Sequence, residues 1–157
     1  MKIGVLIFSR FSSTRLPGKA LLDTNGRELL GRVIDKSKQL VGIAGIAVAT
    51  SDRPDDDCIA GFACSEGVDL YRGDLSDVAQ RAISACHEFG WDAFVRICGD
   101  RPFYDVAVVN ESIRSMCEKP CDLVTTFGDH TLPPGLTTEL LSLASLERYH
   151  QSFQAVH

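Results

Sequence analysis

Five short, mainly apolar runs limit the folds open to this 157-residue chain more than any other feature. They span Ile3–Phe8, Ile43–Thr50, Val68–Tyr71, Ala93–Cys98 and Leu123–Phe127. Runs without polar alternation are typical of strands that are covered on both faces, as in a parallel sheet. The pattern therefore predicts a sheet that lies between two layers of helices.

Helical spacing of apolar residues separates these runs. The expected helices run from Leu29 to Leu40, from Pro54 onward, from Leu75 to Phe89, from Asp105 to Cys117, and from Leu143 to about Phe153. Strands that alternate with helices predict a doubly wound α/β fold, with residues 1–157 as one domain. Such folds bind ligands at the carboxyl ends of strands, near a reversal in strand order.

The charge distribution favours a small anionic ligand. The net charge is −5, which argues against general binding to nucleic acid or to an acidic membrane surface, and no apolar run is long enough to span a bilayer. Residues 1–19 nevertheless hold four basic side chains and no acidic one. A concentrated positive segment on an acidic body suits a small polyanion.

The six cysteines form no Cys-x-x-Cys pair and no zinc-finger spacing with histidine. Several lie in apolar surroundings, as in Ile97-Cys98 and Ala85-Cys86. We interpret them as small buried hydrophobic residues in a reducing cytoplasm, which is the expected location.

The polar segment Ser9–Lys19 directly follows the first apolar run. It places Arg10, Arg15 and Lys19 among hydroxyl side chains that include Ser13 and Thr14. Arginine and lysine side chains bind phosphate oxygens, and the backbone N–H groups of the turn at Pro17-Gly18 can add an anion nest. The alternative is a solvated basic loop.

The spacing in this loop resembles the N-terminal signature of the sugar cytidylyltransferases. These include the acylneuraminate and 3-deoxy-manno-octulosonate enzymes, and the nearest resemblance is to the spore coat polysaccharide biosynthesis branch. The string Ser13-Thr14-Arg15-Leu16-Pro17-Gly18-Lys19 carries the resemblance. Further similar segments follow in family order, at Ala49-Thr50-Ser51-Asp52, Gly73-Asp74-x-x-Asp77-Val78-x-x-Arg81, Arg96-x-x-Gly99-Asp100-x-Pro102 and Pro134-Gly135-Leu136-x-x-Glu139. Phe11 and Ser12 depart from the family, which often has Gly or Met at the first place and usually Gly at the second.

The resemblance implies a Rossmann-like nucleotide-diphospho-sugar transferase fold, with a mostly parallel sheet and helices on both faces. It also implies CTP as donor, a sugar as acceptor and Mg²⁺ as cofactor. CMP would pass to the sugar, an acidic or surface-polysaccharide sugar, with release of pyrophosphate. Arg10, Arg15 and Lys19 would hold the triphosphate and Asp100 the metal, because magnesium prefers carboxylate and phosphate oxygens. Asp100 could instead cap a helix that begins near Pro102.

The remaining candidate residues have structural alternatives. Nucleotide-binding candidates include Ser13, Thr14, Gly18, Ser51, Asp52, Asp77, Arg81 and Arg96. Asp52 could instead cap the helix after Pro54, where Asp55–Asp57 would favour the helix dipole. Asp77 and Arg81 could form an exposed i, i+4 ion pair. Glu139 is a candidate for binding sugar hydroxyls or a solvent-facing strand residue.

Two other functions stay open on these residues. One is a nucleotidyltransferase that uses another nucleoside triphosphate, and the other is a non-catalytic nucleotide-binding module. Family members are commonly longer than this chain, and their later residues commonly supply a second metal-binding acid, the acceptor pocket and a dimer contact. We therefore expect the chain to lack the C-terminal part of the family fold. It should bind CTP but transfer CMP slowly or not at all, unless a partner or a missing segment supplies the second acid. A homodimer is among the expected assemblies.

Overall fold

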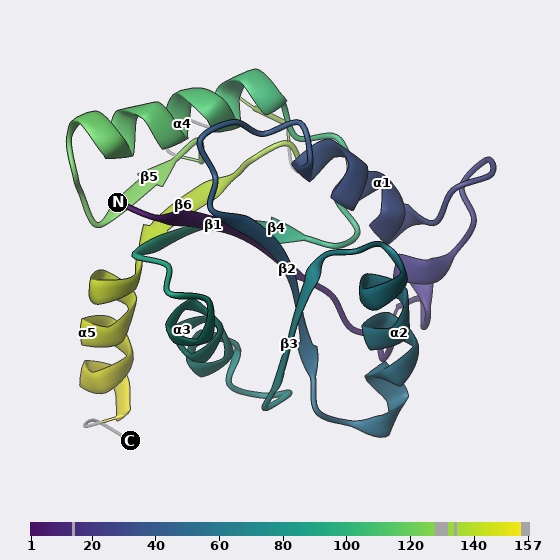
Figure 1. Ribbon diagram of the computed structural model, residues 1–157. Coiled ribbons are helices and arrows are strands. Elements are labelled where there is room, and N and C mark those ends of the chain that lie inside the picture. The colour runs from purple at the N-terminus through teal and green to yellow at the C-terminus, as the bar shows by residue number, and fades with distance from the viewer. Residues whose placement is uncertain (14, 128–131, 134, 155–157) are drawn as a thin grey trace.

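One mixed sheet organises the computed structural model, which describes residues 1–13, 15–127, 132–133 and 135–154. In this part of the chain six strands form the sheet in the order β3-β2-β1-β4-β6-β5 (Figure 1). Neighbours among β1 to β4 pair in parallel, whereas β6 is antiparallel to β4 and to β5. The strands are β1 (Ile3–Phe8), β2 (Gly45–Ser51), β3 (Asp69–Gly73), β4 (Ala93–Cys98), β5 (Leu123–Thr125) and β6 (Glu139–Ser142).

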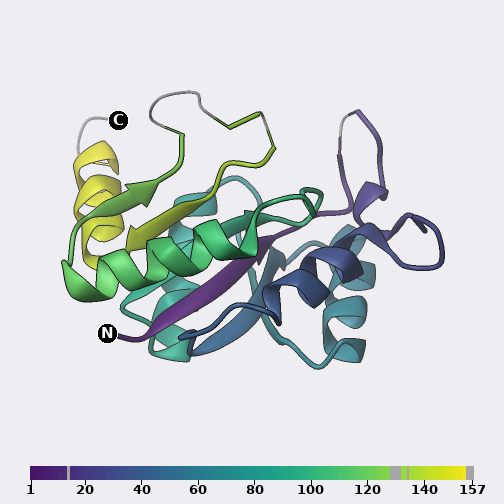
Figure 2. The same cartoon turned by 90° about the horizontal axis from the view of Figure 1, so that it is seen from above.

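Helices cover both faces of the sheet (Figures 1 and 2). Helices α1, α2 and α4 pack on one face and α3 and α5 on the other. The predicted mostly parallel α/β architecture is therefore confirmed. The helices are α1 (Leu29–Ser37), α2 (Asp57–Ser65), α3 (Val78–Phe89), α4 (Val106–Glu118) and α5 (Leu143–Gln154), with short 3₁₀ turns η1 (Lys19–Leu21) and η2 (Pro54–Asp56).

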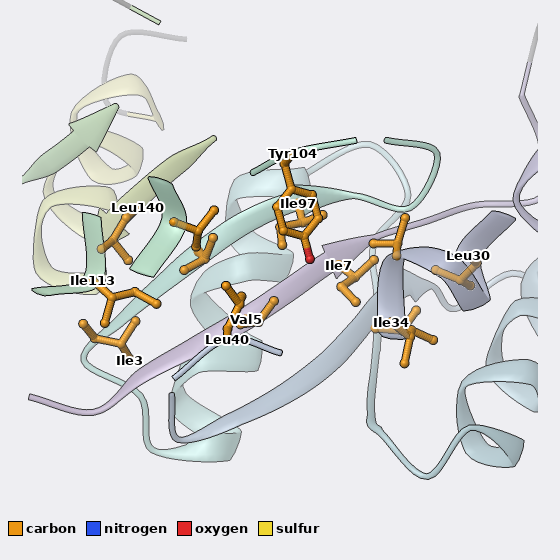
Figure 3. Packing of buried hydrophobic residues seen from close by; sticks show 14 of the residues in the cluster. Ile3, Val5, Ile7, Leu30, Ile34, Leu40, Ile97, Tyr104, Ile113 and Leu140 are labelled. Carbon is orange, nitrogen blue, oxygen red and sulfur yellow. The ribbon is translucent and has the colours of Figure 1, made fainter. Parts of the chain in front are cut away.

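Two apolar clusters, one on each face, hold these layers together. Alternation along β1 sends Val5 and Ile7 into the cluster under α1, α2 and α4, and Leu6 into the cluster under α3. Figure 3 shows the first cluster, in which Leu30 and Ile34 of α1 lie on the sheet beside Ile7. Because β1 is buried on both faces, its continuous apolar run is explained.

On the sheet face covered by α3 and α5, an indole ring packs closely against the backbone of β1. Trp91 is 4% exposed and lies against the backbone of β1 at Gly4, where a Cβ atom would be 2.0 Å from Cδ2 of the indole. A side chain at position 4 would therefore overlap the indole ring in its present place. Phe89, whose ring centroid is 5.0 Å from that of Trp91, packs on the same ring.

Strand β5 differs from the prediction. Its apolar run was interpreted as a strand covered on both faces, but Leu123 is 49% exposed and β5 pairs only with β6, at the end of the strand order. The regular strand also ends at Thr125 rather than at Phe127. An apolar run at a sheet edge cannot be distinguished by composition from one in the centre.

The interpretation of the cysteines as buried residues was wrong for most of them. Only Cys86 is buried among the described residues, and Cys98 is partly exposed. The apolar stripe of α4 runs through Val109, Ile113 and Met116, so the residue after Met116 falls outside it. The exposed cysteines are Cys58, Cys64, Cys117 and Cys121. In the described part of the chain, no helix combines the length and apolar character that crossing a membrane would need.

The strand order places a reversal between β1 and β4. The chain moves from β1 outward to β2 and β3, then crosses to β4 on the opposite side of β1. Phe8, the last residue of β1, lies beside Cys98, the last residue of β4. The segments that leave these two strands therefore emerge side by side at one edge of the sheet, where doubly wound folds bind ligands.

Candidate active site

The loop after β1 and the turn after β4 line a common cavity at this edge of the sheet. We call it the β1–β4 pocket, and it measures about 200 Å³. It collects three cations that the sequence singled out, Arg10, Arg15 and Lys19, together with the carboxylate of Asp100. Its described lining residues are Phe8, Ser9, Arg10, Ser13, Arg15, Lys19, Ala20, Cys98 and Asp100.

A direct ion pair joins the two sides of this pocket. The ammonium of Lys19 contacts Oδ2 of Asp100, and both side chains are partly exposed. Lys19 begins the 3₁₀ turn η1, and Asp100 follows β4 after Gly99. A Cβ atom at Gly99 would lie 2.9 Å from Cβ of Ser9, so the missing side chain lets the two segments approach closely.

Asp100 is not a helix cap. Helix α4 begins at Val106, and its cap is Asp105, whose Oδ1 accepts hydrogen bonds from the backbone N–H of Ala107 (2.7 Å) and Val108 (3.4 Å). The structural alternative for Asp100 therefore does not apply, and its carboxylate faces the pocket.

Phe11 lies at the centre of the loop's internal contacts. Its carbonyl accepts hydrogen bonds from the backbone N–H groups of Ser13 and Gly18, each at 2.8 Å. Its ring packs over Gly18, where an added Cβ atom would lie 2.9 Å from the ring. Gly18 has a φ of 72°, which glycine adopts without strain. The loop thus curls back on itself, and Lys19 leaves it toward Asp100.

A buried carboxylate, that of Asp56 at the start of α2, holds the backbone of this loop. Oδ1 of Asp56, a residue that is 1% exposed, accepts a hydrogen bond from the backbone N–H of Phe11 at 2.6 Å. Oδ2 accepts hydrogen bonds from the backbone N–H of Ser51 (3.2 Å) and from its hydroxyl. Burial by itself would raise the pKa of Asp56, but the donors from Ser51 and Phe11 outweigh it and hold the pKa below its ordinary value.

Ser51 and Asp52, both candidate nucleotide contacts, differ in exposure. Ser51 is fully buried and its hydroxyl is engaged with Asp56. Asp52 is exposed, and its backbone N–H donates to the carbonyl of Gly73 at 3.0 Å. It does not cap the helix after Pro54, since the residue at that position is Arg53 and no side chain there makes a capping bond.

Asp77 and Arg81 do not pair with each other in the described structure. Asp77 caps α3 by accepting from the backbone N–H of Gln80 at 2.8 Å, and its other oxygen lies 2.9 Å from Nε2 of His150 on α5. The bond from Gln80 lowers the pKa of Asp77.

Arg81 points inward beneath Phe8. It is 5% exposed, its guanidinium carbon lies 5.8 Å from the centre of the Phe8 ring, and Nη1 donates to the carbonyl of Asp74 at 3.1 Å. Burial lowers its pKa, while the negative charge of Asp56 acts in the opposite direction. Arg81 is thus a buried cation beside the loop rather than a surface ion-pair partner.

A second cavity of about 140 Å³ lies on the other side of β4, and we call it the β4–β6 pocket. Arg96 and Glu139 face each other across β4 and β6, with Nη1 of Arg96 2.7 Å from Oε2 of Glu139. The structure thus sets Arg96, a predicted nucleotide contact, beside Glu139, the predicted sugar contact, and outside the described lining of the β1–β4 pocket. Its described lining residues are Arg96, Ile97, Cys98, Arg101, Tyr104, Phe127, Gly135, Thr137, Thr138 and Glu139.

Sequence reasoning missed several residues of these two pockets. Cys98, the last residue of β4, lines both of them. Arg101 lines the second pocket and Ser9 the first, and both adjoin residues that the motifs had already marked. Their position next to Asp100 and Arg10 was the available signal. Thr14 and Pro134, as well as residues 128–131, lie outside the described residues.

The donor set at Asp100 fits a magnesium ion that also contacts phosphate. The Asp100 carboxylate already holds a cationic group, the Lys19 ammonium. In the described part of the chain no three His, Cys, Asp or Glu side chains gather into a metal cluster. Magnesium commonly takes one or two carboxylates and completes its shell with substrate phosphates and water.

A cytidylyltransferase family model matches residues 4–152. The chain belongs to the cytidylyltransferase family. It is 36% identical over 127 residues to 3-deoxy-manno-octulosonate cytidylyltransferase of Acinetobacter baumannii, a match that covers 77% of this chain and 49% of that enzyme. The chain thus spans about half the length of that curated relative.

Solved structures agree with the fold of this cytidylyltransferase domain. A cytidylyltransferase from Leptospira borgpetersenii superposes with a TM-score of 0.91 at 29% identity, covering 96% of this chain and 64% of that one. A CMP:2-keto-3-deoxy-manno-octonic acid synthetase complexed with CTP superposes with a TM-score of 0.73 at 20% identity, covering 96% of this chain and 78% of that one. At the latter identity the likeness concerns the fold alone.

Proposed function

We propose that this domain binds CTP and transfers CMP to a hydroxyl group of a sugar, with release of pyrophosphate. The observation that carries the proposal is the pairing of Lys19 with Asp100 across the β1–β4 pocket. It sets a cation for the phosphates beside an acid for magnesium, at the edge of the sheet where doubly wound folds bind nucleotides. Membership in the cytidylyltransferase family supports cytosine as the base.

The triphosphate would lie in the β1–β4 pocket. Arg10 and Arg15 are exposed on its rim, and Lys19 is partly exposed within it. As the bond between the α-phosphorus and its bridging oxygen breaks, negative charge accumulates on the departing pyrophosphate. Fixed cations at that place stabilise the charge and lower the barrier. Bound magnesium would supply further neutralisation of the phosphate oxygens, held by Asp100.

The acceptor sugar would enter from the β4–β6 pocket. That pocket offers the Arg101 guanidinium, the Glu139 carboxylate and the polar pair Thr137 and Thr138. Carboxylate and hydroxyl groups hydrogen-bond sugar hydroxyls, and a guanidinium suits a sugar carboxylate. Cys98 lines both pockets, and we propose that a hydroxyl held in one reaches the α-phosphate held in the other beside it. The new oxygen–phosphorus bond forms there, and the hydroxyl proton passes to solvent.

Each pocket takes only part of the substrates. Cavities of about 140 and 200 Å³ are smaller than the roughly 300 Å³ at which typical ligand pockets begin. The phosphates in one pocket and part of the acceptor in the other match these sizes better than a whole nucleotide in either.

Calorimetric titration with CTP, CDP, cytidine and the other nucleoside triphosphates tests the nucleotide half of the proposal. We expect affinity to rise with phosphate number and to be highest for CTP. Equal affinity for cytidine and CTP would contradict the phosphate assignment, and stronger binding of UTP or GTP would indicate another nucleotidyltransferase. Pyrophosphate release in the presence of a panel of acidic and neutral sugars tests the transfer, and CTP binding without turnover on any of them would favour a binding module.

A further inference from the structure

The carboxylate of Asp56 does not serve its own helix. Asp56 occupies the N-terminal cap position of α2, where an aspartate ordinarily accepts a hydrogen bond from a backbone N–H one turn later. Here its side chain makes no capping bond. Both oxygens instead turn away from α2, one to Phe11 and the other to Ser51.

These contacts connect the loop after β1 (residues 9–19, called the β1 loop below) to the end of β2. Oδ1 holds the backbone N–H of Phe11 and Oδ2 holds Ser51, so one carboxylate bridges two neighbouring strand ends. Phe11 is 36% exposed, yet its N–H donates to the carboxylate of Asp56, a residue that is 1% exposed. Solvent therefore cannot easily replace the acceptor, and a hydrogen bond to a buried charge is stronger than one between neutral groups.

Phe11, which Asp56 holds through its backbone N–H, in turn contacts the side of the loop that would bind phosphate. Its carbonyl holds the backbone N–H groups of Ser13 and Gly18, and its ring covers Gly18. The residue after Gly18 is Lys19, which pairs with Asp100. A continuous series of contacts thus runs from Asp56 through Phe11 and Gly18 to the ammonium in the β1–β4 pocket.

We propose that Asp56 is a positioning residue that holds the β1 loop, through the N–H of Phe11, in the shape that binds a triphosphate. This assignment rests on the proposed nucleotide function of the pocket. Arg81 is also buried, and the negative charge of Asp56 raises the pKa of Arg81 against the effect of burial. Asp56 touches neither pocket and acts only through the loop backbone.

Asp56→Asn tests the proposal, because asparagine keeps the shape but can accept hydrogen bonds through one oxygen only. Its amide nitrogen must face an N–H donor of either Phe11 or Ser51. We expect hydrogen exchange of the Phe11, Ser13 and Gly18 amides to speed up about tenfold or more, from the usual strength of a charged hydrogen bond. Exchange of the β1 amides should stay unchanged. Affinity for inorganic tripolyphosphate should fall by about tenfold as the loop loosens.

Two variants serve as controls. Asp55→Asn removes the same charge from an exposed neighbour in the same turn and should leave loop exchange and tripolyphosphate affinity unchanged. Ser51→Ala removes one donor from Asp56 but leaves the bond to Phe11, so it should lower the melting temperature without loosening the loop. A merely structural role for Asp56 would instead make Ser51→Ala and Asp56→Asn alike in every readout.

The wild-type protein keeps the proposal testable even if Asp56→Asn does not fold. Its Phe11 amide should exchange slowly despite lying in an exposed loop, and exchange at the rate of an unprotected amide would overturn the proposal. So would a folded Asp56→Asn variant with unchanged exchange and unchanged tripolyphosphate affinity. If the wild type binds neither tripolyphosphate nor CTP, the nucleotide function fails by itself, and the exchange rates still decide whether Asp56 fixes the loop.

Discussion

Replacing Asp100 with asparagine should change CTP affinity in opposite directions with and without magnesium. In the ligand-free protein the Asp100 carboxylate holds the Lys19 ammonium, so a triphosphate must break this pair before it can use the cation. The amide of asparagine keeps the shape of the side chain and removes its charge. Lys19 is then free for phosphate, and one negative charge no longer faces the triphosphate.

The structure sets the size of each change. The side chains of Lys19 and Asp100 are 27% and 29% exposed, so solvent screens the pair and its strength is about 0–1 kcal/mol. Without magnesium, Asp100→Asn should therefore tighten CTP binding by up to about fivefold. With magnesium the variant loses the carboxylate that would hold the ion. Loss of a charged contact of about 1.5–3 kcal/mol then weakens CTP by roughly 10- to 100-fold.

Calorimetric titration of CTP in EDTA and in excess magnesium, with melting temperatures of both proteins, measures this reversal. Asp55→Asn, an equal charge change on an exposed residue, should alter affinity little in either buffer. Weaker binding of equal size in both buffers would mean that Asp100 acts by holding Lys19 in place. Unchanged affinity in magnesium would refute the assignment of Asp100 as the metal ligand.

Three further substitutions test other parts of the site and the fold. Lys19→Ala should weaken CTP by about 1.5–3 kcal/mol in calorimetry and leave cytidine unaffected, whereas an equal loss for cytidine would argue against a phosphate contact. Glu139→Gln should raise the KM for the acceptor and not for CTP, with a stability change below about 1 kcal/mol because its pair with Arg96 is exposed. Gly4→Ala places a methyl group into the Trp91 ring and should cost about 1–3 kcal/mol. Its melting temperature should fall by about 2–4 °C for each kcal/mol, and an unchanged value would show that the ring can move away.

The central strands could be predicted from sequence because their burial leaves a simple pattern. The mainly apolar runs at Ile3–Phe8 and Ala93–Cys98 match β1 and β4 residue for residue, since every residue of these strands except Phe8, Arg96 and Cys98 is buried. Helix α3 was expected from Leu75, but it begins at Val78 because Asp77 caps it. Strand β5 departs from this pattern, because its apolar residues lie at an open edge of the sheet.

The candidate site could be predicted as a set of charges but not as a set of contacts. The loop spacing indicated Arg10, Arg15 and Lys19, and the structure brings them to one pocket with Asp100. Asp56 was interpreted only as one of several acids near a helix N-terminus. Its bond to Phe11 joins residues 45 positions apart, and no local pattern encodes such a pairing.

The β1 loop is held at both ends by carboxylates from different strand junctions, and this arrangement reconciles rigidity with ligand binding. At the buried end, Asp56 binds backbone N–H groups and is itself closed to solvent, so that contact persists when a ligand arrives. At the open end, Asp100 binds the Lys19 side chain in a partly exposed pocket, so that contact can be exchanged for phosphate. Because the backbone is already fixed, ligand binding has to immobilise only the ends of a few cationic side chains. The loss of conformational entropy on binding is therefore small. Phe11, which stands where the family often has Gly or Met, fits this design, because its ring covers Gly18 and stiffens the turn that presents Lys19.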